Sequence, residues 1–135
     1  MSLTLTNQDK NTLRTAAYGA VSLLAAADAA GSPHKVATHG SVALYSSIGP
    51  VGYVLAEKSN DIKLNVKSTA ELADLVLPAL TESMLLLKKQ DPAEAENFRS
   101  TVLVALDAGA RARKGEPGPG LTEMARKITA ALDAA

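Results

Sequence analysis

The chain has 135 residues and carries 14 basic and 14 acidic side chains, so its formal net charge is zero. It therefore lacks the basic excess with which nucleic-acid-binding proteins usually neutralise phosphates. Because it contains no cysteine, disulfides and sulfur-ligated metals are excluded. The aromatic residues are three tyrosines and one phenylalanine, so alanine and leucine must supply the core, which favours packed helices over a β-sandwich.

The first predicted helix begins at Thr6, because Thr6 and Asp9 have the spacing of a capping box. Apolar residues then recur at three- and four-residue intervals, which places them on one helical face. These residues are Leu13, Ala16, Ala17, Ala20, Leu23, Leu24 and Ala27. The helix is expected to end before Gly31.

Ser32 and Pro33 open a second predicted helix, with serine as the N-cap and proline at the first helical position. This helix is expected to be interrupted at Gly49-Pro50, since both residues disfavour a continuous helix. Residues 51–57 are predicted to form a short further helix. A strand is the alternative there, although no partner strand is evident downstream.

The stretch from Ser68 to Gln90 is predicted to be the central helix. Ser68 and Glu71 repeat the capping-box spacing, and apolar residues cover more than one face of the helix that follows. A helix with so wide an apolar arc is usually buried by several neighbours.

Two more helices are predicted, at 92–114 and 121–134, separated by the proline- and glycine-rich loop 116–120. The fold class is therefore all-α, a compact bundle of five or six helices around a central apolar helix at about 69–89, in a single domain spanning 1–135. Both ends of the chain have the order long helix, Gly/Pro turn, shorter helix. Two duplicated helix–turn–helix halves are thus an open alternative.

His34 and His39 are the two histidines. A spacing of five residues turns their side chains roughly 140° apart on a helix, which is poor for shared metal binding. No metal site, cofactor or catalytic set is predicted. His34, His39, Tyr45 and Tyr53 are instead candidate polar groups of a ligand pocket near the Gly49-Pro50 break.

Arg111, Arg113 and Lys114 form a local basic cluster before the glycine-rich loop, and are a candidate anion site. The alternative is that these charges complement the dipole at a helix C-terminus. Asp107 lies four residues before Arg111 and could pair with it.

Two functions are compatible with these patterns. The first is a non-enzymatic helical protein that acts through protein contacts or self-association, as a homodimer. The second is a small-ligand-binding protein or enzyme with a pocket near Gly49-Pro50, whose ligand the sequence does not identify. No nucleic-acid or membrane partner is expected. Without a signal sequence or an apolar stretch of about 20 residues, the protein is expected to be cytoplasmic.

Overall fold

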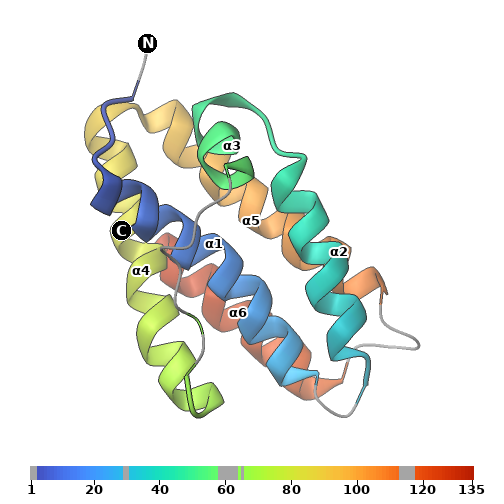
Figure 1. The fold of residues 1–135 in the computed structure, drawn as a ribbon. Coiled ribbons are helices and arrows are strands. Elements are labelled where there is room, and N and C mark those ends of the chain that lie inside the picture. Colours follow the sequence, from blue (N-terminus) through green and yellow to red (C-terminus); the bar gives the residue numbers. More distant parts are fainter. Residues whose placement is uncertain (1–2, 29–30, 58–63, 65, 113–117) are drawn as a thin grey trace.

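The structure is a computed structural model that describes residues 3–28, 31–57, 64, 66–112 and 118–135. These residues form six α-helices and no strand, which confirms the prediction of an all-α bundle (Figure 1). The helices are α1 (Asn7–Ala27), α2 (Pro33–Tyr45), α3 (Gly49–Ala56), α4 (Thr69–Gln90), α5 (Pro92–Ala112) and α6 (Pro119–Asp133).

Side-chain caps explain where the long helices begin. At α1 the Thr6 hydroxyl accepts a hydrogen bond from the Asp9 N–H, and the Asp9 carboxylate accepts one from the Thr6 N–H, each at 3.0 Å. At α4 the Ser68 hydroxyl accepts from the Glu71 N–H, whereas the Glu71 carboxylate accepts from the N–H of Lys67. Both caps satisfy backbone donors that a helix start otherwise leaves unpaired.

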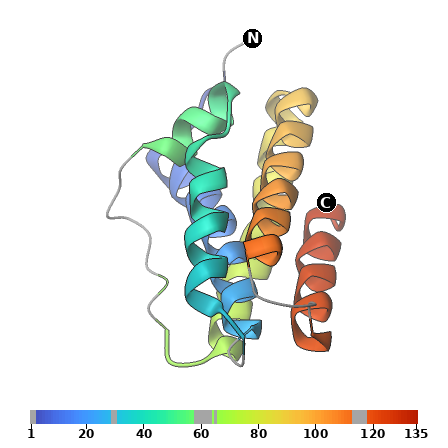
Figure 2. The same ribbon diagram turned by 90° about the vertical axis from the view of Figure 1, so that its right-hand side faces the viewer.

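The helices pack as two close pairs, α1 with α4 and α2 with α5, with α1 touching every other helix. The short helix α3 lies at one end of the bundle against α1, α2 and α5. Helix α6 lies at the opposite edge, mainly against α1 and α4 (Figure 2).

The most enclosed helix is α1, whereas the sequence pattern placed α4 at the centre. Twelve of the 21 residues of α1 are buried, compared with six of the 22 residues of α4. On α4, Leu77 and Leu86 pack against the core, but Leu75 and Leu85 stay 39% and 48% exposed. The wide apolar arc of α4 is therefore only partly covered.

Close approach of the backbones explains why α1 takes the central position. A Cβ atom at Gly19 would lie only 2.4 Å from a methyl group of Val76 on α4. A Cβ atom at Gly40 on α2 would lie 2.7 Å from a methyl group of Val21 on α1. Glycine at these two positions lets α4 and α2 approach within distances that any larger residue would prevent.

The two ends of the chain repeat in helix order but not in packing. Helices α1 and α5 have 21 residues each, and α2 and α6 have 13 and 15. Helix α2 packs extensively along both α1 and α5, while α6 touches α5 only at a small contact. The two helix pairs therefore have different surroundings in the fold.

Candidate functional site

The four residues predicted to line a ligand pocket all lie at the surface. His34 and His39 are exposed on α2, and Tyr45 and Tyr53 are 58% and 76% exposed. Tyr45 packs at a tilted angle on the ring of Tyr18, with ring centroids 6.0 Å apart. The structure does not collect the four side chains around one cavity.

A shallow cavity of about 300 Å³ does lie beside the Gly49-Pro50 break, and Tyr53 is part of its wall. Its lining consists of Leu3, Leu5, Lys10, Pro50, Tyr53 and Val54. The break itself is as predicted, because α2 ends at Tyr45 and α3 begins at Gly49. Gly49 has φ +80°, a left-handed conformation that favours glycine.

Of the predicted anion site, only Arg111 falls within the part of the chain that the structure describes. Its guanidinium pairs with the Asp107 carboxylate one turn earlier, at 2.9 Å, on the exposed side of α5. Arg113 and Lys114 lie outside the described residues. The Asp107–Arg111 pair confirms the spacing argument for these two side chains.

A charged side chain is buried on α1, where the side chain of Arg14 is only 5% exposed. Its Nε donates to the carbonyl oxygen of Val54 at 3.1 Å, and a second guanidinium nitrogen donates to Glu57 at 3.0 Å. One turn further along α1, the Tyr18 hydroxyl donates to the Leu55 carbonyl at 2.5 Å. Burial raises the pKa of Tyr18 to about 12, with a further contribution from Tyr45. Arg14 and Tyr18 thus satisfy carbonyls that the C-terminus of α3 would otherwise leave unpaired.

The other end of α3 is held by α5. The Glu94 carboxylate accepts a hydrogen bond from the Val51 N–H at 3.2 Å, and the Asn97 side chain donates to the Ile48 carbonyl at 3.0 Å. Negative charge at a helix N-terminus and positive charge at its C-terminus both complement the helix dipole. Helix α3 has only eight residues, so these tertiary contacts, rather than its own length, hold it in place.

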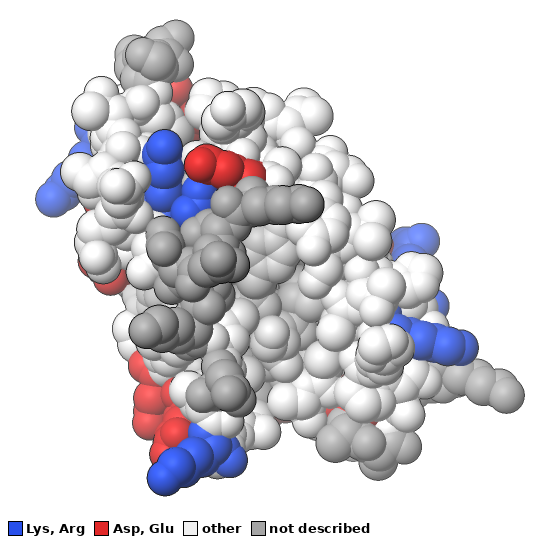
Figure 3. Space-filling model, viewed as in Figure 1, with Lys and Arg blue, Asp and Glu red and all other residues white. Residues whose placement is uncertain are grey.

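Helix α3 and most of α2 belong to a stretch of the chain without charged side chains. Residues 36–56 contain no aspartate, glutamate, lysine or arginine. Four large hydrophobic side chains in this stretch are at least half exposed: Val42 (53%), Tyr45 (58%), Ile48 (78%) and Tyr53 (76%). We call these four residues the α2–α3 face. Figure 3 shows a broad area without charged side chains over α2. Large exposed apolar side chains on neighbouring elements are typical of a surface that binds another molecule.

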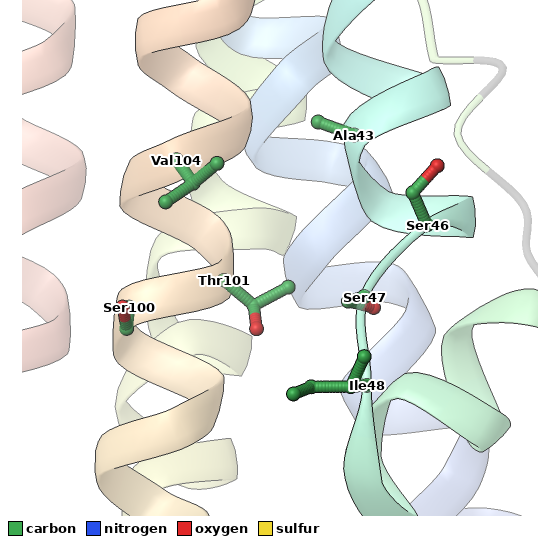
Figure 4. Close-up of a pocket in the computed structure, with 7 residues that line it drawn as sticks. All are labelled: Ala43, Ser46, Ser47, Ile48, Ser100, Thr101 and Val104. Atoms are coloured by element: carbon green, nitrogen blue, oxygen red, sulfur yellow. The ribbon is translucent and has the colours of Figure 1, made fainter.

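A groove of about 300 Å³ runs between the end of α2 and the middle of α5. The residues that line it, which define the α2–α5 groove, are Ala43, Ser46, Ser47, Ile48, Ser100, Thr101 and Val104 (Figure 4). Each is either a small hydroxyl residue or apolar, and the lining carries no charge. Its composition suits binding better than acid–base chemistry, which requires a titratable group.

Acidic and histidine side chains do not converge elsewhere in the described ranges. No group of three or more His, Asp or Glu residues there is arranged to hold a metal ion. Nor does any described helix combine the length and apolar character needed to cross a lipid bilayer.

Comparison with known proteins adds no relative. No protein-family model matches the chain, and neither the curated proteins nor the solved structures provide a match.

Sequence reasoning missed the buried Arg14 and the part that α5 plays in the α2–α5 groove. Arg14 follows the apolar Leu13, and its partners lie 40 and 43 residues away, so no local pattern marks it as buried. For the α2–α5 groove a partial signal was present, namely the Gly49-Pro50 break next to Ile48. The contribution of α5 to this groove had no comparable signal in the sequence.

Proposed function

We propose that the protein is a non-enzymatic helical module that acts through protein contacts, and that its first partner is a second copy of itself. The observation that carries this proposal is the α2–α3 face, where Val42, Tyr45, Ile48 and Tyr53 expose apolar surface without a nearby charge on the same elements. Burying such surface is favourable at roughly 25 cal/mol per Å².

The absence of charge in residues 36–56 favours a second copy over a charged partner. In a two-fold contact the same surface is used by both copies, and residues near the axis meet their own counterparts, so like charges there would repel one another. A standard interface buries about 800 Å² per partner. This is roughly a tenth of the 7281 Å² surface of the chain, an area that two neighbouring helices can provide.

The structure favours this face over the exposed leucines of α4. Leu75 and Leu85 are ten residues apart, which separates them by about 15 Å along the helix. Their partly buried neighbours Leu77 and Leu86 already pack against the core. The α4 leucines thus do not form one compact patch.

Sedimentation equilibrium at micromolar concentrations tests the proposal. The wild type is expected to sediment as a dimer, and Val42→Glu is expected to shift it towards the 13.9 kDa monomer. Leu85→Glu is the matched control, since Leu85 has similar exposure but lies on α4. A wild-type protein that is monomeric throughout would refute the proposal. Dissociation by Leu85→Glu but not by Val42→Glu would move the interface to α4.

A further inference from the structure

Residues 3–5 precede α1 and are tied to the C-terminal end of α4 by one side chain (Figure 1). The Gln90 amide accepts a hydrogen bond from the Thr4 N–H at 2.7 Å and donates one to the Thr4 carbonyl at 2.9 Å. Leu3 and Leu5 are partly buried and pack against the core, whereas Thr4 is exposed. This alternation is typical of an extended segment with one apolar side. We call residues 3–5 the strap.

The start of α1 does not depend on the strap. The N–H of Thr6 is bonded to the Asp9 carboxylate, and the Thr6 hydroxyl accepts from the Asp9 N–H. This capping box completes the helix start whether or not the strap is seated. Both bonds from Thr4 to Gln90 are exposed to solvent. Because segments held by few buried contacts open at a lower free energy than the whole fold, the strap can open while the bundle stays folded.

Opening of the strap would uncover apolar surface on α3. Leu3 and Leu5 form part of the wall of the shallow cavity near the Gly49-Pro50 break, and Tyr53 and Val54 of α3 form another part. Val54 is only 4% exposed while the strap is seated, whereas Tyr53 is 76% exposed and belongs to the α2–α3 face. The surface beside the strap therefore continues the face that we assign to self-association.

We propose that the strap is an autoinhibitory contact that limits self-association through the α2–α3 face. This inference rests on the dimer proposed above. The seated strap hides apolar surface next to Tyr53, so only molecules with an open strap present the complete face to a second copy. When the binding-competent state is a small fraction of the molecules, the apparent dissociation constant is raised in proportion. Removing the bonds to Gln90 therefore strengthens the dimer.

Gln90→Ala tests this contact in the full chain, because it removes both bonds to Thr4. Sedimentation equilibrium is expected to give a dimer dissociation constant about fivefold lower than that of the wild type, which corresponds to one net hydrogen bond. Gln8→Ala is the matched control. It makes the same substitution at an exposed position of α1, and it is expected to leave the constant unchanged. An unchanged or a weaker dimer in Gln90→Ala would overturn the proposal.

The opening of the strap is measured separately, by the reactivity of a thiol on α3. The natural chain has no cysteine, so Val54→Cys introduces a single thiol beside the strap. Labelling with N-ethylmaleimide, at a concentration too low for dimers, is expected to be about fivefold faster when Gln90→Ala is added. Adding Gln8→Ala instead is expected to leave the rate unchanged. Equal rates in all three proteins would show that the strap does not shield α3.

The two measurements distinguish failure of this proposal from failure of the dimer. A wild-type dimer whose dissociation constant is unchanged by Gln90→Ala would refute the autoinhibitory contact and leave the α2–α3 face in place. Monomers at every concentration, in both the wild type and Gln90→Ala, would refute self-association and the regulation that rests on it.

Discussion

Replacing Arg14 with methionine tests whether tertiary contacts hold α3. Methionine preserves most of the aliphatic volume of the buried side chain but removes the bonds to the Val54 carbonyl and to Glu57. Val54 is 4% exposed, so water gives its carbonyl little compensation. Leaving such an acceptor unpaired costs about 1–3 kcal/mol. Glu57 is 45% exposed on its side chain, and losing that half-solvated ion pair adds about 1 kcal/mol or less.

The expected loss for Arg14→Met is therefore about 2–3 kcal/mol in the free energy of unfolding. For a chain of this length, that loss corresponds to a fall of about 7–11 °C in Tm. Urea denaturation followed by circular dichroism at 222 nm measures it. Arg126→Met is the control, because Arg126 pairs with Glu123 at an exposed position of α6, and it should change stability by less than about 0.5 kcal/mol. In some proteins the apolar replacement of a buried ion pair leaves stability unchanged. If Arg14→Met had wild-type stability, the hydrogen bond from Arg14 to the Val54 carbonyl would not stabilise the fold.

Three further predictions concern helix packing, pH and the start of α3. Gly19→Ala should destabilise the fold by about 1–3 kcal/mol, because the new Cβ would clash with Val76. The control Gly118→Ala should cost about 1 kcal/mol at most, because the space around Gly118 is open. Denaturation of both variants, with Val76→Ala added to test rescue of Gly19→Ala, measures this difference. Because the pKa of Tyr18 rises from 10.0 to about 12, the unfolded chain loses this proton first, so stability should fall as the pH rises from 10 towards 12. Urea midpoints at pH 9 and 11 should show a smaller fall in Tyr18→Phe than in the wild type. Glu94→Ala removes a hydrogen-bond acceptor at the N-terminus of α3 and should lower the free energy of unfolding by about 1–2 kcal/mol. In this variant, amide hydrogen exchange that is faster in α3 than in α6 would show that the effect is local to α3.

Local signals predicted where the capped helices begin, since capping and turn formation depend on neighbouring residues. The prediction for the last helix was wrong by two residues, because Pro119 takes the first helical position and α6 begins there, inside the predicted loop 116–120. Thr6 with Asp9 begins α1, and Ser68 begins α4, as their spacing indicated. The interruption at Gly49-Pro50 also follows from the chain itself, because glycine can adopt positive φ and proline fixes the start of a helix.

Which helix is most enclosed could not be obtained in the same way. The apolar arc of α4 is wide, but enclosure depends on how closely neighbouring backbones approach. That approach is determined by pairs such as Gly19 with Val76, which lie far apart in the sequence. Side-chain hydrophobicity alone favoured the leucine-rich helix over the alanine- and glycine-rich α1.

The candidate sites show the same division between local and tertiary information. The uncharged character of residues 36–56 can be read from the sequence. The α2–α5 groove cannot, because the residues that line it lie far apart in the sequence and meet only where the turn after α2 lies beside α5.

The α2–α3 face and the α2–α5 groove both depend on the turn between α2 and α3. Asn97 binds the Ile48 carbonyl directly, while Glu94, Arg14 and Tyr18 hold the two ends of α3 immediately after that turn. Ile48 contributes to the α2–α3 face and also lines the α2–α5 groove. A variant that releases α3 should therefore lower stability and weaken self-association together, whereas Val42→Glu changes the proposed protein contact alone.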